Sequence, residues 1–334
     1  MLTDKDFTHV ISGYSSAFSI ANVFKLPTLS VVKCGDILSI GKQNLSDDYS
    51  VWANARKAAL AEAWGLKPDE LSDTGERFEL FHNYDSIAEG KPVLLWLDCN
   101  LNSHLMAAFI CYLFRANGWD LSRLHSVSYE RVEREIYKGM LTVLNDEELR
   151  SRRPENKKLS SADFNSYADI WTTLAGQSLA DIISVCASGE ASKLTMDTLR
   201  YFTRRFPSRF NGLNEIEQDL LKHTIDCAPD AAKAVGFAMG YDETPDMLGD
   251  LYLIARLRRF GAADLKHPLI EIDNPSGSVR EFQVRVLPLA HQILSGASNM
   301  IELNGLDDWI GGAHLAPDNV IYREDAGFGG QGWP

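Results

Sequence analysis

The sequence predicts an α/β protein with a mostly parallel sheet in its N-terminal domain and a helical region that ends in a winged-helix-like (α+β) unit. Three observations predict this order. Short apolar segments alternate with segments of helical period over about the first 130 residues, which is typical of a parallel sheet. The alternation then stops, and helical patterns follow one another. Near the C-terminus, three helical patterns precede two strand-like segments.

The N-terminal elements follow from apolar runs and from the residues that interrupt them. The strand at 93–97 is apolar throughout, as expected of a strand that is covered on both faces. Ser15 or Ser16 can cap the first helix, and Gly65 is typical of a helix end. We predict strands at 7–13, 29–34, 93–97 and 123–129, helices at 15–25, 48–64, 102–117 and 131–144, and an acidic helical stretch at 68–84.

The C-terminal elements are mainly helical. The sequence Asn274-Pro275-Ser276-Gly277 is a strong turn signal between two predicted strands. Asn214 and Glu217 have the spacing of a capping box, and Thr195 is placed to cap an earlier helix. We predict helices at 161–175, 178–187, 195–206, 214–226, 230–239, 246–260 and 288–295, and strands at 269–273 and 282–286.

Length and composition indicate an ordinary globular protein. A chain of 334 residues suggests two domains, at roughly 150 residues per domain. The basic segment 150–158 lacks apolar residues, so we predict a linker there, domains at 1–149 and 159–324, and a flexible Gly-rich tail at 325–334. The five cysteines are odd in number and form no CxxC pair, which predicts buried free thiols in a reducing compartment.

Charge and hydropathy exclude some classes of partner. The net charge of −13 argues against binding to nucleic acid and to anionic membranes. The longest apolar stretch, Leu105–Phe114, is too short to span a bilayer, and the first residues lack the features of a signal peptide. We therefore expect a cytoplasmic protein with no membrane partner.

Several motifs resemble an uncharacterised bacterial family, a domain of unknown function called DUF 1835. They are His9-Val10-Ile11-Ser12-Gly13-Tyr14, Leu95-Trp96-Leu97-Asp98, Asn211-Gly212-Leu213-Asn214-Glu215-Ile216-Glu217, Leu248-Gly249-Asp250 and Trp309-Ile310-Gly311-Gly312-Ala313-His314-Leu315. The resemblance covers nearly the whole chain and implies the architecture, but no established reaction. The chain has Tyr14 where the family usually has Asp. After Trp96 the family's pattern is rich in acidic residues, His and Gln, and this chain departs from that pattern. Any reaction that relatives perform with those residues would therefore be lost or changed here.

The first candidate site is the loop that joins the first strand to the first helix. Gly13, Ser15 and Ser16 lie where the free N–H groups of a helix N-terminus can cradle a phosphate or carboxylate. The alternative is an ordinary tight turn with a helix cap. No Walker motif is present, and the GxGxxG pattern at 327–332 has neither a strand before it nor a helix after it.

The second candidate site lies where two predicted strands end at an acidic residue, Asp36 and Asp98. Ligands of open parallel sheets bind beyond the carboxyl ends of the strands. We predict Asp98 and His104 as a catalytic acid–base pair, with His9, Asp36 and Asn100 as ligand-binding residues that converge on it. The alternative is that Asp98, Asn100 and Asn102 only cap the following helix and that His104 is merely exposed. No metal-binding motif is present, so we predict no metal.

Two further features carry weaker signals. The clearest basic patch outside the linker consists of Arg200, Arg204, Arg205 and Arg209. A second group, at the end of the third helix of the winged-helix-like unit, consists of Arg256, Arg258 and Arg259. Against a nucleic-acid contact, residues 213–287 hold 13 Asp and Glu but only 8 Lys and Arg. The glycines that follow Trp309 allow a close backbone approach. His314 then either projects into an interface or belongs to a C-terminal wrap that packs Trp309 on the helices.

These observations leave two functional hypotheses open. The first is a binding site at the strand ends for a small anionic ligand of the nucleotide or phosphate type. This site could also be catalytic, and the C-terminal unit would serve for docking or homodimer formation. The second is a non-enzymatic interaction or regulatory protein that binds protein, peptide or DNA through the winged-helix-like unit. The sequence names no cofactor and no reaction.

Overall fold

A computed structural model describes residues 3–67, 70–72, 79–129, 141, 144–151, 153–188, 191–240, 246 and 248–323. Its centre is a six-stranded sheet with the order β3-β2-β1-β4-β5-β6. Strands β1 (Thr8–Ser12), β2 (Val31–Cys34), β4 (Val93–Leu97) and β5 (Leu124–Ser128) run parallel. In their register, Val10 of β1 pairs with Val32 on one side and Leu95 on the other. The predicted mostly parallel sheet is therefore confirmed.

Both edges of the sheet carry short antiparallel strands that the sequence did not indicate. Strand β3 (Phe81–His82) pairs with β2, inside the stretch predicted to be helical. In the rest of the described part of 68–84, only η3 (Glu70–Ser72) has helical character. Strand β6 (Lys157–Lys158) pairs with β5, so the segment predicted as a linker contributes to the sheet.

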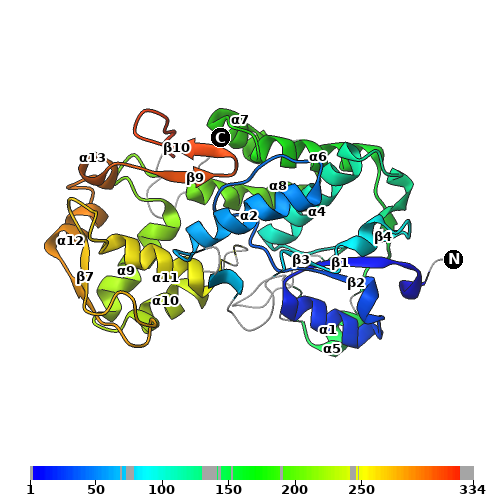
Figure 1. Ribbon diagram of the computed structural model, residues 1–334, viewed down its shortest axis with the longest axis horizontal. Coiled ribbons are helices and arrows are strands. Elements are labelled where there is room, and N and C mark those ends of the chain that lie inside the picture. Colours follow the sequence, from blue (N-terminus) through cyan, green and yellow to red (C-terminus); the bar gives the residue numbers. More distant parts are fainter. Residues whose placement is uncertain are drawn as a thin grey trace.

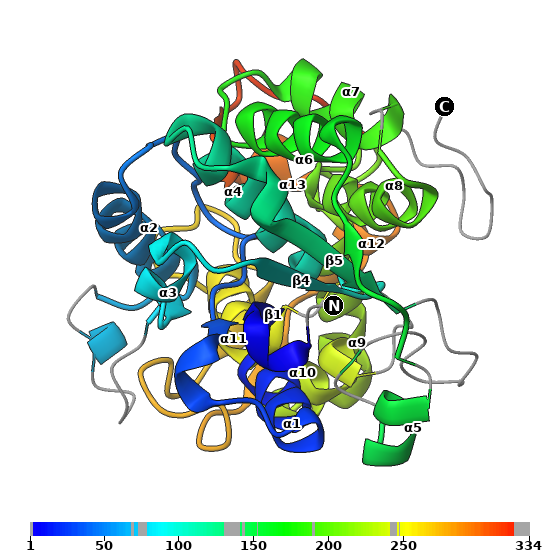
Figure 2. The ribbon, with the colours of Figure 1, turned by 90° about the vertical axis from the view of Figure 1, so that its right-hand side faces the viewer.

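Helices cover both faces of the sheet, which explains the apolar character of β4. Figure 2 shows α1 (Tyr14–Phe24) and α5 (Asp146–Ser151) below the sheet and α4 (Leu101–Ala116) and α6 (Ser161–Leu174) above it. Side chains alternate along a strand, so Val93, Leu95 and Leu97 join the upper core. Leu94 and Trp96 join the lower core, and all five residues of β4 are buried as predicted.

Helix α4 is the centre of the upper core. Asn100 caps its N-terminus by accepting a hydrogen bond from the backbone N–H of Asn102 at 2.8 Å. Most of its side chains are buried, because the sheet lies on one side of α4 and α6 packs along it. Helix α2 (Tyr49–Ala63) begins at the cap Asp48 and adds Trp52, which stacks on Phe109 of α4.

The remaining chain is mainly helical, as predicted; in Figure 1, α7 and α8 lie above the sheet and α9 to α13 lie to its left. The predicted helix at 195–206 is divided, and Ser192 rather than Thr195 caps its first part. The capping box of Asn214 and Glu217 is confirmed. The helical elements are α7 (Leu179–Ser188), α8 (Lys193–Leu199), η6 (Arg200–Arg205), α9 (Glu215–Cys227), α10 (Ala231–Gly240), α11 (Gly249–Phe260), α12 (Pro288–Leu294) and α13 (Met300–Asn304).

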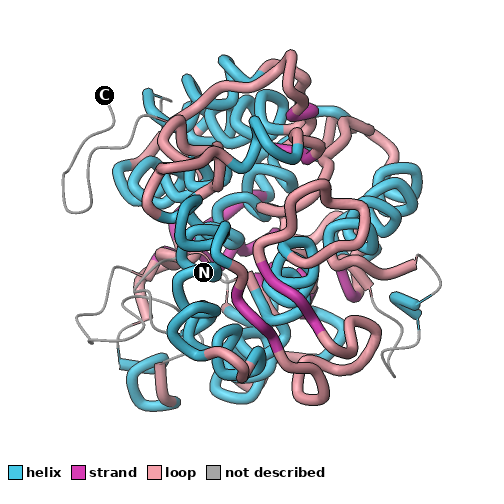
Figure 3. The backbone as a smooth tube through the Cα atoms, turned by 90° about the vertical axis from the view of Figure 1, so that its left-hand side faces the viewer, coloured by secondary structure: helices cyan, strands magenta, loops and turns pink. Residues whose placement is uncertain are grey.

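Two antiparallel hairpins complete the C-terminal region. The predicted pair is present as β7 (Ile270–Ile272) and β8 (Val284–Val286), which lie at the end of the molecule that faces the viewer in Figure 3. Three helices, α9 to α11, precede this hairpin as expected; their winged-helix-like character stays a prediction. The second hairpin, β9 (Asp308–Ile310) with β10 (Ala313–Leu315), was not predicted.

The turn of the second hairpin lies directly on the end of α6. The backbone N–H of Gly312 donates to the carbonyl of Leu174 at 2.8 Å, and Gly311 has a φ of 57°. A Cβ atom on Gly311 would overlap the carbonyl oxygen of Leu174. The predicted close backbone approach is therefore confirmed. The carbonyl of Gly311 also accepts a hydrogen bond from the N–H of Gln43 at 2.8 Å, which ties the turn to the loop after β2.

Some predictions lie wholly or largely outside the described residues. These are the helix at 131–144, of which only 141 and 144 are described, the tail at 325–334 and the GxGxxG pattern within it. Across the described ranges, every helix is too short or too polar to cross a bilayer. All five cysteines are free thiols, and four of them are buried.

Candidate functional site

The strand-end rim, which comprises Ser12, Gly13, Asp36, Asp98 and the first turn of α4, brings several predicted polar residues together. The side-chain amide of Asn102 donates to Ser12 Oγ at 3.0 Å and to the carbonyl of Asp36 at 2.6 Å. Its Oδ1 accepts from the N–H of Leu38 at 2.7 Å. One buried amide therefore joins the ends of β1 and β2 to α4, and its hydrogen-bonding groups are all used.

Asp98 is buried and accepts three hydrogen bonds from the protein. Oδ1 accepts from the N–H of Asn100 at 3.0 Å and from Ser103 Oγ at 2.9 Å. Oδ2 accepts from the N–H of Leu141 at 2.7 Å. Burial raises the pKa of the Asp98 carboxyl, although these donors oppose the shift. The arrangement matches the capping alternative, because the carboxylate holds the first turn of α4.

His104 does not form the predicted acid–base pair with the Asp98 carboxylate. Its Nε2 lies 2.8 Å from the backbone carbonyl of Asp98, so Nε2 carries the proton that is donated there. Its Nδ1 lies 3.2 Å from the hydroxyl of Tyr167. Burial lowers the pKa of His104 to about 4, so the imidazole is neutral at pH 7.

His9 and Asp36 do not converge on Asp98 either. His9 belongs to the lower face of the sheet, where its Nδ1 accepts a hydrogen bond from Trp96 Nε1 at 3.0 Å. Its Nε2 donates to the carbonyl of Asp4 at 2.8 Å, and burial lowers its pKa. The Asp36 carboxylate forms a buried bidentate pair with Arg56 at 2.8 and 2.9 Å. The predicted convergence is wrong, because each side chain has a separate partner.

The predicted anion loop has the geometry of a turn and a helix cap. Gly13 has a φ of 82° and precedes α1, and its N–H donates to the carbonyl of Cys34 at 2.8 Å. Ser15 is exposed, whereas Ser16 is buried. The ring of Tyr14 lies so close to Gly35 that a Cβ atom there would overlap it. Tyr14 therefore covers the end of β2, beside the loop that was predicted to bind an anion.

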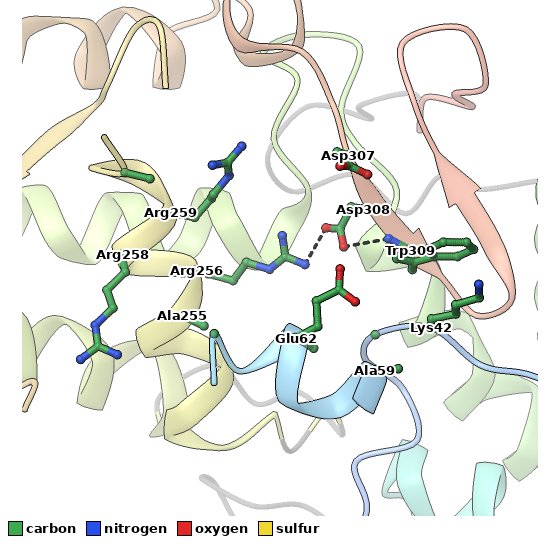
Figure 4. Close-up of a pocket in the computed structure, with 14 residues that line it drawn as sticks. Lys42, Ala59, Glu62, Ala255, Arg256, Arg258, Arg259, Asp307, Asp308 and Trp309 are labelled. Carbon is green, nitrogen blue, oxygen red and sulfur yellow. Dashed lines mark hydrogen bonds and ion pairs between the residues drawn. The ribbon is translucent and has the colours of Figure 1, made fainter. Parts of the chain in front are cut away.

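A hollow lies elsewhere, between α2, α11 and β9. This α2–α11 pocket has a volume of about 360 Å³. Figure 4 shows its lining, which combines charges of both signs with small residues and one indole ring. The lining residues are Gly41, Lys42, Ala59, Glu62, Ala63, Gly65, Ala255, Arg256, Arg258, Arg259, Ala262, Asp307, Asp308 and Trp309.

Most charged groups of the α2–α11 pocket are already engaged by the protein. Arg256 pairs with Asp308 at 2.5 Å and with Glu217 at 3.4 Å. Burial disfavours the Arg256 charge, but these carboxylates outweigh burial and raise the pKa of Arg256 above its usual value. Arg259 pairs with Asp264, and Asp307 with His314. Arg258 points away from the pocket in Figure 4 and donates to the carbonyl of Gly277 at 2.6 Å.

Lys42 and Glu62 differ from these groups. The Lys42 ammonium lies 4.0 Å from the centroid of the Trp309 ring, in a cation–π contact. The Glu62 carboxylate points into the pocket in Figure 4. Both side chains are exposed, and among the described residues neither has an ion-pair partner. The Lys42 ammonium and the Glu62 carboxylate are therefore available to a ligand.

The loop that carries Lys42 is positioned by one of the residues predicted from the sequence. Arg56, held by Asp36, donates to the carbonyl of Lys42 at 3.0 Å and to that of Ile37 at 2.9 Å. Gly41 has a φ of 63°, and a Cβ atom there would be 3.0 Å from the carbonyl oxygen of Ala59. Asp36 therefore acts at a distance from the pocket, by fixing the loop through Arg56.

Sequence reasoning named Arg256 as part of a basic group and Trp309 for the glycines that follow it, but missed Lys42 and Glu62. Neither belongs to a motif, and the three segments that meet here are far apart in the chain. The other basic residues serve the fold, since Arg204 pairs with Glu215 and Asp219, and Arg205 pairs with Asp246. Within the described residues, no group of three or more His, Cys, Asp or Glu side chains could hold a metal ion.

No protein-family model matches the chain, and no curated protein matches it in sequence. The resemblance to DUF 1835 therefore stays a prediction.

Proposed function

We propose that the protein binds a small charged ligand in the α2–α11 pocket. The observation that carries the proposal is that two oppositely charged side chains, Lys42 and Glu62, line one hollow and have no ion-pair partner among the described residues. A volume of about 360 Å³ suits a small ligand, since small-molecule sites measure roughly 300–1,000 Å³. The strand-end rim is a weaker candidate, because Asp98, Asn102 and His104 already have protein partners.

The contacts that hold the walls of the pocket indicate a preformed binding site. Arg256, Asp308 and Glu217 form a half-buried ion-pair group at one side of it, which fixes α11 to β9 and α9. The loop at 41–42 is held by Arg56. A ligand therefore meets a rigid wall and two exposed, adjustable side chains, so little ordering of the backbone is needed on binding.

The test is a thermal-shift screen of the full chain against inorganic phosphate, nucleotides, carboxylic acids, amines and free amino acids, followed by calorimetry on each compound that stabilises. We expect at least one compound to bind, and K42M/E62Q to weaken its binding about tenfold or more, the effect of losing one charge-assisted contact. The control is K222M/E147Q, which changes the same residue types at exposed positions outside the pocket.

Two outcomes would overturn the proposal. One is a screen in which no compound stabilises the protein. The other is a compound whose affinity is the same in K42M/E62Q and in the natural sequence. Because Lys42 and Glu62 are exposed and without ion pairs in the described residues, both variants are expected to fold with unchanged melting temperatures.

A second candidate function is docking of a protein partner through the C-terminal unit. The succession of α9, α10, α11 and the β7–β8 hairpin favours it. A contact with DNA is disfavoured, because Arg256 and Arg259 of α11 pair with carboxylates. Size-exclusion chromatography with light scattering tests the simplest form of this candidate, a homodimer. A monomer at all concentrations would contradict that form.

A further inference from the structure

We infer that the ligand of the α2–α11 pocket is a zwitterion, a compound with one ammonium and one carboxylate group such as a free α-amino acid. This inference rests on the proposed binding function and specifies its ligand class. It follows from three properties of the pocket: the sign of the charges that remain unengaged, their placement on different sides of the hollow, and the small residues between them.

The first property is the balance of charge. Four cationic and three anionic side chains line the pocket. Arg256 and Arg259 pair with carboxylates, Asp307 is hydrogen-bonded to His314, and Arg258 is directed outward. The Lys42 ammonium and the Glu62 carboxylate are the two charged lining groups that have no such partner among the described residues. A simple anion would meet Lys42 but be repelled by Glu62. A simple cation would have the opposite difficulty. A ligand with both charges satisfies both side chains.

The second property is the separation of these two charges. Lys42 and Glu62 form no ion pair with each other, although both line the same hollow. The Lys42 ammonium is held at the Trp309 ring. In Figure 4 the Glu62 carboxylate is directed toward the side of the pocket that Arg256 and Asp308 form. The ammonium of a ligand would therefore be favoured near Glu62, and its carboxylate near Lys42.

The third property is the small size of the uncharged walls. Ala59 and Ala63 of α2, Ala255 of α11 and Ala262 after it line the pocket, and Gly41 and Gly65 belong to the same lining. Methyl groups and glycines leave room for the carbon skeleton of a ligand and give it apolar surface to contact. The charges select the two polar groups of the ligand, and the alanines accommodate what joins them.

The experiment measures binding of each of the twenty free amino acids to the full chain by saturation-transfer NMR, and the dissociation constant of the tightest by calorimetry. It then compares that amino acid with two analogues, the acid that lacks the amino group and the amine that lacks the carboxyl group. We expect each analogue to bind about tenfold more weakly or worse, since each loses one charge-assisted contact.

The variants assign each charge to one side chain. We expect E62Q to weaken binding of the amino acid about tenfold and to leave binding of the deaminated acid unchanged or stronger. We expect K42M to weaken binding of the amino acid by a similar factor and to leave binding of the amine unchanged or stronger. The controls E147Q and K222M should change none of these dissociation constants.

The outcomes separate this inference from the proposed function. If no amino acid binds but another small compound does, and K42M/E62Q weakens its binding, the zwitterion is wrong and the binding function stands. If an amino acid binds with an affinity that neither K42M nor E62Q changes, the zwitterion inference and the proposed binding function are both wrong for this pocket. If each analogue binds as tightly as the amino acid, the two-charge recognition is overturned.

Discussion

Buried polar side chains at the strand ends serve the fold rather than an exposed site. Asp98, Asn100 and His104 were predicted because carboxylates, amides and imidazoles at strand ends are the residue types of many active sites. The same residue types also cap helices and satisfy backbone groups, and their sequence pattern is the same in both roles. Only the partners distinguish the roles, and here the partners are mostly backbone atoms.

His104 predicts a pH dependence of stability. Its pKa is about 4 in the folded protein and about 6.5 when exposed, so the folded state binds fewer protons between these values. The contribution of neutral His104 to the free energy of unfolding is fully present above pH 6.5 and is lost as the pH falls toward 4. The full shift corresponds to about 3 kcal/mol of unfolding free energy.

Urea unfolding of the natural sequence and of His104→Gln between pH 7.5 and 4 checks this prediction. The glutamine keeps a donor toward the Asp98 carbonyl but does not titrate, so the variant should lose less stability on acidification. The control His291→Gln, at an exposed histidine, should follow the natural sequence. Parallel curves for His104→Gln and the natural sequence would contradict the assignment.

The buried pair of Asp36 and Arg56 predicts strong coupling between two substitutions. Asp36→Leu or Arg56→Met alone leaves one unpaired buried charge, and each should lower the free energy of unfolding by about 3–5 kcal/mol. The double variant removes both charges and should be at least about 2 kcal/mol more stable than the sum of the single changes predicts. Denaturant unfolding of all four proteins measures this coupling. Simple additivity would show that the pair does not act as a unit.

At the scale of elements, long amphipathic or fully apolar segments were predictable and short paired ones were not. Strand β4 and helix α4 lie within a residue of their predicted bounds, because a five-residue apolar run and a long apolar helix face are strong patterns. Strands β3 and β6 have two residues each, too few to show any period. They form because β2 and β5 offer free edges, so their formation depends on tertiary structure and not on a local sequence pattern.

The β9–β10 hairpin was missed for a related reason, although its turn was noticed. Three-residue strands carry little periodicity, but the Gly311-Gly312 pair signalled a close approach. The neighbour, the end of α6, could not be read from the sequence. Likewise, the pocket depends on Lys42 and Glu62, which no motif marks and which only the packing of α2 against α11 and β9 brings together.

Gly311→Ala should destabilise the protein by about 3 kcal/mol, because a methyl group would overlap the Leu174 carbonyl and because φ is positive. The matched control is Gly118→Ala, which has a φ of 63° but no atom within 4 Å of its added Cβ. The control isolates backbone strain and should cost about 1 kcal/mol. Thermal and urea unfolding measure both. Equal losses in the two variants would show that the contact with α6 contributes nothing.

At the scale of the whole molecule, one apolar core extends through most of the chain. The upper core includes Val10 and Leu95 of the sheet, Leu220 of α9 and Leu315 of β10. Helix α6, beyond the predicted linker, packs along α4. The alternation of elements predicted the sheet correctly, but composition alone could not show how closely the helical region covers it.

This shared core predicts a single cooperative unfolding transition. Differential scanning calorimetry should give one peak whose calorimetric and van't Hoff enthalpies agree. Two resolved peaks would instead support independent folding of 1–149 and 159–324. Limited proteolysis at 150–158 provides a second test, because a cut there should release no stable fragment if β6 and α6 are needed to cover β5 and α4.

The three segments that line the pocket also have a consequence for biosynthesis. The hairpin that carries Trp309 reaches α6 through Gly312 and the loop after β2 through Gly311. A nascent chain therefore lacks a complete pocket until nearly all of residues 3–315 have left the ribosome. Binding of the ligand would then require that synthesis has passed the last hairpin. Chains that end before Trp309 would be unable to bind the ligand.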